Sequence, residues 1–276
     1  MVRQQNHPPQ KEINSMTQII VAEDSSSNWN SLYRVGGVAA LMAGIIFRRN
    51  LGAEISLFAI QKQPETISAW FTLLHNNRFL GLSYLNIFDL ANYALVGVMF
   101  LSLLIVLRQA NKSYMTIAAA FGFLGIAVYF ASNTALSMLS LSDQYAAATT
   151  EAQRASLLAS GQATLALNRF SSPGAHPGAG GYLSLLLIAV AGMMISIIML
   201  RSHVFNRVTA YVGILASALD LAYCMTYAFI PAVDVALLAI YFIPAAGLFW
   251  MVWHILIGQR LYQMGRLAKK SLSTES

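Results

Sequence analysis

Carboxylate and amide side chains interrupt an apolar stretch in the first half of this 276-residue chain. Between residues 82 and 107, Asp89 lies between Asn86 and Asn92, and Tyr93 follows directly. A helix brings residues three, four and seven apart onto one face, so these four side chains form a polar stripe. A carboxylate in such a stripe can bind a small solute or take part in proton coupling.

Two further apolar runs carry similar stripes. Their members are Tyr129, Asn133 and Ser137 in the first, and Ser217, Asp220, Tyr223, Cys224 and Tyr227 in the second. Burying an ionised group in hydrocarbon costs ~2.5–3.5 kcal/mol, so we expect the stripes to face one another or water. Alternatively, polar partners hold Asp89 and Asp220 in place, and these residues then set helix register and nothing else.

The composition indicates a membrane protein. The chain is 57% hydrophobic and only 10% charged, with a mean hydropathy of +0.58, which is too apolar for an ordinary soluble domain. Its net charge of +6 comes from cations at the ends of apolar runs rather than from a basic patch interleaved with aromatics. This distribution argues against nucleic acid as a partner. The single cysteine excludes an intramolecular disulfide.

Spanning a bilayer takes ~20 mainly apolar residues, and six runs qualify as candidates. The first begins at Leu32, and the others are Leu82 to Leu107, Tyr114 to Leu139, Tyr182 to Leu200, Val208 to Ile230 and Val235 to Ile257. Arg48 and Arg49 interrupt the first run, so they either reach the interface or face protein inside the membrane. The predicted fold is all-α, a six-helix transmembrane bundle with two short extracytoplasmic helical segments.

The predicted organisation has three parts. Residues 1–31 form a polar cytoplasmic tail, 32–258 the transmembrane bundle, and 259–276 a basic cytoplasmic tail. The outer segments cover about 50–81 and 141–181 within the bundle domain. Lys and Arg are more numerous on the side that carries both termini, which places the termini in the cytoplasm and the protein in the plasma membrane.

Both outer segments have helical patterns. The apolar residues of the first have helical spacing and predict an amphipathic helix in the membrane interface; they are Ile67, Trp70 as the anchor, Phe71 and Leu74. The second is rich in Ala, Leu and Gln, and Thr149 or Thr150 is its predicted N-cap. Near the cytoplasmic end of the last span, Trp250, Trp253 and His254 are typical of an aromatic belt.

The polar residues together predict an outward-facing cavity. Asp220 lies at its base, Asp89 and Asn133 form its wall, and Arg48 and Arg49 lie at its mouth. The full candidate set is Asp89, Asp220, Asn86, Asn92, Asn133, Tyr93, Tyr129, Tyr223, Tyr227, Arg48 and Arg49.

The sequence predicts no catalytic residue, metal site or cofactor. Its histidines are dispersed, and no HExxH, GxSxG or paired-carboxylate motif occurs. An intramembrane enzyme would need His75 and His176 to converge with a carboxylate such as Asp143 or Glu151, which makes this class the least favoured.

Three segments resemble the bacterial membrane-protein family known as domain of unknown function 4386. They are SLYRVGGVAALMAGIIF, NIFDLANYALVGVMFLSLL with the short basic turn after it, and the Ala-rich DQYAAATTEAQRASLLASGQA. The resemblance covers most of Leu32 to Gly258. It implies a multi-pass membrane protein without assigned activity, and it carries over no functional residue.

The leading hypothesis is a small-solute transporter or permease that uses Asp89 and Asp220. The alternative is a non-catalytic scaffold or sensor that meets a partner through its outer helices. The expected partners are the lipid bilayer and a small solute, and oligomeric state is left open.

Overall fold

Helices form nearly all of the described chain. The computed structural model describes residues 29, 31–46, 64–167, 178–202, 204–230 and 235–274, without the side chains of 235–241, 243 and 267–274. These ranges contain no strand. The helices are Ser31–Ile46, α2 (Ile67–Asn76), α3 (Arg78–Tyr84), α4 (Ile87–Leu107), α5 (Lys112–Ser132), α6 (Ala135–Ala147), α7 (Glu151–Leu167), α8 (Ala179–Arg201), α9 (Arg207–Phe229) and α10 (Val235–Thr274).

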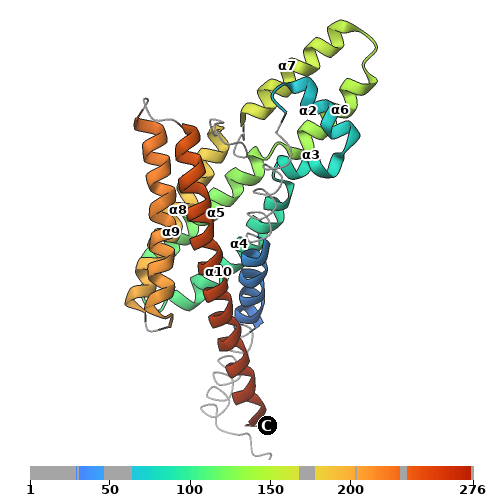
Figure 1. Cartoon of the computed structure of the whole chain (residues 1–276). Helices are drawn as coiled ribbons and strands as arrows, with labels where there is room; N and C mark the ends of the chain where they lie inside the picture. Colours follow the sequence, from blue (N-terminus) through green and yellow to red (C-terminus); the bar gives the residue numbers. More distant parts are fainter. Residues whose placement is uncertain are drawn as a thin grey trace, which may run out of the picture.

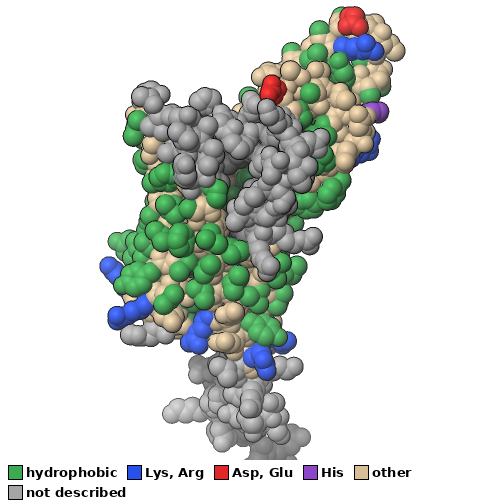
Figure 2. All heavy atoms as spheres, viewed as in Figure 1, with side chains coloured by type: hydrophobic (Ala, Val, Ile, Leu, Met, Phe, Trp, Pro, Cys, Tyr) green, Lys and Arg blue, Asp and Glu red, His purple; other side chains and the backbone are tan. Residues whose placement is uncertain are grey.

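Four helical stretches are long and apolar enough to cross a bilayer. They are α4, the stretch Lys112–Ala147 that comprises α5 and α6, α8, and α9. Large apolar side chains such as Leu101, Leu124 and Leu183 point outward from them, and Figure 2 shows apolar atoms over the visible face of the bundle. Water would not favour such a surface, so the protein is embedded in a membrane. The other two predicted spans, in Ser31–Ile46 and in α10, stay predictions.

The long helices pack side by side in a bundle (Figure 1). In the order of contact, α4 lies against α5, α5 against α8, α8 against α9, and α9 against α10. Glycines allow close approach in the bundle: a side chain at Gly125 of α5 would meet Ser184 and Ile188 of α8. Helix Ser31–Ile46 lies between α10 and α4. Its Gly37 abuts Gly258 of α10, and its Leu32 carbonyl oxygen accepts a hydrogen bond from Ser102 of α4.

A second helical unit, which we call the cap, projects from one end of the bundle and consists of α2, α3, α6 and α7 (Figure 1). It has its own apolar core. The predicted helix at α2 is confirmed, but its predicted contact with lipid is wrong. Trp70 is only 4% exposed and packs edge-on against Tyr84, because α6 and α7 cover the apolar face of α2.

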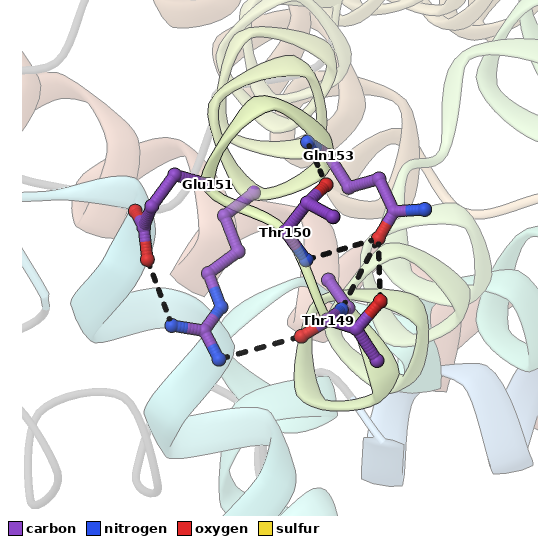
Figure 3. A network of polar contacts seen from close by, with 6 residues as sticks. Thr149, Thr150, Glu151 and Gln153 are labelled. Carbon is purple, nitrogen blue, oxygen red and sulfur yellow. Dashed lines mark hydrogen bonds and ion pairs between the residues drawn. The ribbon is translucent and has the colours of Figure 1, made fainter.

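The N-terminus of α7 is held by a capping box (Figure 3). Thr150 Oγ1 accepts a hydrogen bond from the Gln153 backbone N–H at 3.2 Å. In return, Gln153 Oε1 accepts from the backbone N–H groups of Thr149 and Thr150 at 3.1 and 3.3 Å. This reciprocal pairing satisfies donors that a helix end leaves free. The predicted N-cap is therefore confirmed, with Thr150 in that role.

Two predicted runs are interrupted in the structure. The run predicted as Leu82 to Leu107 breaks at Asn86, whose φ of 58° lies in the left-handed region that asparagine tolerates. The run predicted as Tyr114 to Leu139 breaks at Asn133, whose side chain accepts from the Ala135 N–H at 3.1 Å. The basic cytoplasmic tail 259–276 stays a prediction, and α10 continues through this region to Thr274.

Candidate functional site

The two helix breaks bring polar groups of α4 and α5 together at the cap end of the bundle. Tyr129 Oη donates to Asp89 Oδ2 at 3.3 Å. Asn133 Nδ2 lies 3.4 Å from the carbonyl oxygen of Asn86 and 3.5 Å from Tyr129 Oη. We call Asn86, Asp89, Tyr129 and Asn133 the α4–α5 cluster. Four residues of the candidate set therefore meet where α4 begins and α5 ends, and Asp89 and Asn133, the two predicted wall residues, are among them.

Tyr93 connects this cluster to the interior of the bundle. It lies one turn after Asp89, and its ring stacks on Tyr129 with centroids 4.1 Å apart. Tyr93 is within electrostatic range of both Asp89 and Asp220. Tyr93 therefore interacts electrostatically with both aspartates.

Asp220 is the most enclosed acidic side chain of the described residues, with only 6% of its surface exposed. It accepts one hydrogen bond, from Trp250 Nε1 of α10 at 2.6 Å. The ion pairs found in the described ranges both lie in the cap, Arg78 with Asp143 and Arg154 with Glu151. Asp220 therefore has a single neutral donor beside it and no basic partner from the described chain.

The remaining predicted tyrosines form a separate aromatic group between α8 and α9. Tyr227 lies 5.8 Å from Tyr182 and 6.3 Å from Tyr223, measured between ring centroids. Tyr182 Oη donates to the carbonyl oxygen of Cys224 at 3.2 Å. Tyr223 and Tyr227 follow Asp220 on α9, but they join this group rather than the α4–α5 cluster.

The other predicted site residues have different fates. Asn92 is 2% exposed, and its Oδ1 has no hydrogen-bond partner in the described part of the chain. Ser137 lies beyond the break at Asn133 and is exposed on α6, so its predicted place on the α5 stripe is wrong. Arg48 and Arg49 lie outside the described residues, as does His176.

Sequence reasoning missed a group of buried residues on α10. Trp250, Trp253 and His254 were expected in an aromatic belt at the membrane surface, and this expectation is wrong. Their exposed fractions are 6%, 0% and 2%, and His254 Nδ1 lies 2.6 Å from the Trp250 carbonyl oxygen. The signal that could have placed them inside is their spacing of three and four residues, with Ile257 continuing the same face.

No group of three His, Cys, Asp or Glu side chains that could hold a metal ion occurs within the described ranges. His75 is exposed on α2, and Asp143 is paired with Arg78 at 2.9 Å. The carboxylates of Asp89 and Asp220 can accept hydrogen bonds and attract positive charge. These properties suit the binding of a group that donates hydrogen bonds or carries a positive charge.

The comparison with family models identifies the chain. A model described as a domain of unknown function (DUF4386) matches residues 31–258. The chain belongs to this family. The match includes helix Ser31–Ile46, the cap and the bundle up to Gly258 of α10, so the DUF4386 region contains every described residue of the site. No curated protein and no solved structure matches the chain.

Proposed function

We propose that this membrane protein binds a small polar solute between α4, α5, α8 and α9 and carries it across the membrane. Asp220 is the main binding group in this proposal, and the α4–α5 cluster forms the approach from the cap end. The solute carries a cationic or hydrogen-bond-donating group, because the side chains available to it are carboxylates, tyrosines and amides.

The observation that carries the proposal is the setting of Asp220. A buried charge with a purely structural role normally has a counter-charge or several hydrogen bonds, since removing it from water is costly. Asp220 has one hydrogen bond, from an indole, and no basic neighbour in the described chain. A solute that donates to this carboxylate would supply the missing partner.

Charge at the two ends of the bundle supports an orientation with the basic end in the cytoplasm of a bacterium. Arg108 and Lys112 border the turn between α4 and α5, and Arg201 and Arg207 border the turn between α8 and α9. Figure 2 shows Lys and Arg side chains but no acidic ones at this end of the visible face, whereas the cap carries both signs of charge. Positive charge is retained on the cytoplasmic side of membrane proteins. The proposal therefore places both termini inside and the cap outside the plasma membrane.

Uptake into proteoliposomes tests the proposed function. The full chain is reconstituted, and entry of radiolabelled choline, putrescine, lysine, alanine and glucose is compared with protein-free vesicles. We expect at least one probe to enter faster with the wild type. Asp220→Asn should slow that uptake by about tenfold or more, as expected for losing a hydrogen bond to a charged group.

Asp143→Asn provides the matched control, because it makes the same chemical change in an exposed ion pair of the cap. It should leave uptake unchanged. If Asp220→Asn transports every probe as the wild type does, or no probe enters faster than in protein-free vesicles, transport through Asp220 is wrong and the scaffold alternative is favoured.

A further inference from the structure

Besides Asn92, three buried polar groups where α8, α9 and α10 meet have no hydrogen-bond partner in the described chain. They are the hydroxyls of Ser196 on α8 and Ser217 on α9, and the indole N–H of Trp253 on α10. Each residue is 0% exposed. An unpaired polar group away from water costs several kcal/mol on apolar transfer scales, roughly 2–7. A molecule that hydrogen-bonds to these groups would remove that cost.

Glycines bring these groups together. A Cβ atom on Gly213 of α9 would meet both Ser196 Oγ and Trp253 Nε1, so these two polar atoms converge over the Gly213 backbone. A Cβ on Gly192 of α8 would meet Ser217 Oγ at 2.8 Å and also the Trp250 ring. The polar atoms of α8, α9 and α10 thus lie next to two glycines, Gly192 of α8 and Gly213 of α9. We call this place the junction.

The junction continues directly from Asp220. Gly213, Ser217 and Asp220 lie four and three residues apart, so they share one face of α9. Seven residues of helix cover about 10 Å, and this stretch runs from Asp220 toward the basic end of the bundle. On α10, Trp250 hydrogen-bonds to Asp220, and Trp253 lies about one turn further toward the basic end. The polar groups of α9 and α10 therefore extend from Asp220 in the same direction.

We propose that a short chain of water molecules occupies this junction and links Asp220 toward the basic end of the bundle. Water both donates and accepts, so it can accept from the Trp253 indole, exchange hydrogen bonds with Ser196 and Ser217, and donate to the Asp220 carboxylate. Buried water typically makes about three hydrogen bonds, which this set of groups provides.

Such a chain gives Asp220 a route for protons. An excess proton at one end forms an O–H bond with the next water while that water releases a proton forward, so each oxygen ends with the number of protons it began with. The titratable groups near this route are Tyr93 of α4 and Cys224 of α9 beside Asp220, and His254 next to Trp253 on α10. This inference rests on the proposed function only in taking Asp220 as the binding group.

Exchange of the Trp253 indole proton tests the water chain directly. The full chain is labelled with 15N-indole tryptophan, placed in lipid nanodiscs and transferred to D2O, and Trp253→Phe identifies the signal. With water present, the Trp253 N–H exchanges within the experiment although the residue is 0% exposed. Ser196→Ala and Ser217→Ala each slow this exchange by about tenfold, as expected for losing one hydrogen bond to water.

Ser184→Ala is the control, because Ser184 is a buried serine of α8 whose hydroxyl already donates to the Gly125 carbonyl oxygen at 2.9 Å. It should leave Trp253 exchange unchanged. A Trp253 N–H as protected as the backbone of α8 in the wild type would overturn the inference, as would exchange that neither serine substitution slows. Gly213→Ala is a further variant, in which the added methyl group would block the junction. If this variant does not fold, the two serine variants still test the inference.

Proton flux gives a second readout that separates the two proposals. Vesicles containing the protein and a pH-sensitive dye should take up protons under an inside-negative potential, and Ser196→Ala should reduce the rate. A dry junction with normal solute uptake rejects only the water chain. Rapid indole exchange without uptake of any solute rejects only the transport function.

Discussion

At the scale of the residue, Trp250 provides the buried Asp220 carboxylate with a hydrogen bond while its ring packs among apolar side chains. The indole fills space in the bundle and presents one donor, so it can satisfy a carboxylate without adding a charge. Asp220 therefore has a hydrogen-bond donor but no counter-charge in the described chain. A lysine or arginine in the place of Trp250 would give Asp220 a basic partner, and the proposed solute would then lose its binding group.

Removing this donor should be costly. Trp250→Phe leaves the buried carboxylate without its hydrogen bond, and we expect a loss of ~1.5–3 kcal/mol in the free energy of unfolding. Circular dichroism during unfolding in mixed detergent micelles measures it. In an Asp220→Asn background the same substitution should cost less, so the double-mutant cycle reports coupling. Trp70→Phe, in the buried core of the cap, controls for ring size, and additive effects of the first pair would contradict the prediction.

The sequence could indicate the two aspartates but not their partners. A carboxylate in an apolar run is conspicuous, and helical spacing assigns Asp89, Tyr93 and Asp220 to polar faces. Tryptophan suits both the membrane interface and a packed interior, so Trp250 carries no such signal. Which of these it adopts depends on how far α10 is shifted along α9, and periodicity within one helix does not contain that shift.

At the scale of the element, the sequence predicted helices well and their interruptions poorly. The lengths of α4, α8 and α9 follow directly from the lengths of the apolar runs in the sequence. The breaks at Asn86 and Asn133 do not, because asparagine is tolerated both within a helix and at its end. These breaks decide the site, since they turn α3 and α6 away into the cap and leave the α4–α5 cluster at the junction.

The cap depends on close packing of α7 against α2. A Cβ on Gly161 would lie 2.7 Å from atoms of Ile67 and of Phe71. Gly161→Leu should therefore separate the two helices and destabilise the cap by ~1–3 kcal/mol, the usual cost of overpacking. Hydrogen exchange of α7 measured by mass spectrometry should increase. Ser160→Leu places the same side chain at an exposed neighbouring position, and equal exchange in the two variants would argue against this packing.

The capping box of α7 gives a smaller effect. Thr150→Ala removes the acceptor for the Gln153 N–H, and we expect ~1 kcal/mol of local destabilisation with fraying of the first turn. Hydrogen exchange should rise in residues 151–154 and stay unchanged in α8. Thr150→Ser keeps the hydroxyl and should behave as the wild type. Equal protection of the first turn in Thr150→Ala would show that the cap packing alone holds it.

At the scale of the whole molecule, a membrane protein of packed helices could be predicted from composition alone. What composition could not reveal is the division into a bundle and a projecting cap with its own apolar core (Figure 1). The apolar face of α2 has the same pattern whether lipid or protein covers it. Only the fold shows that α6 and α7 take the place of lipid there.

Orientation is testable because Cys224 is the only cysteine and is buried. In a Cys224→Ala background, Ala159→Cys places a thiol on the exposed surface of α7, and Lys112→Cys places one at the basic end. A membrane-impermeant maleimide added to intact cells should label the first and leave the second unlabelled until the cells are permeabilised. The reason is the excess of Lys and Arg at the α4–α5 and α8–α9 turns, which cytoplasmic loops retain. The opposite labelling would invert the molecule, so that the proposed solute would reach the α4–α5 cluster and Asp220 from the cytoplasm.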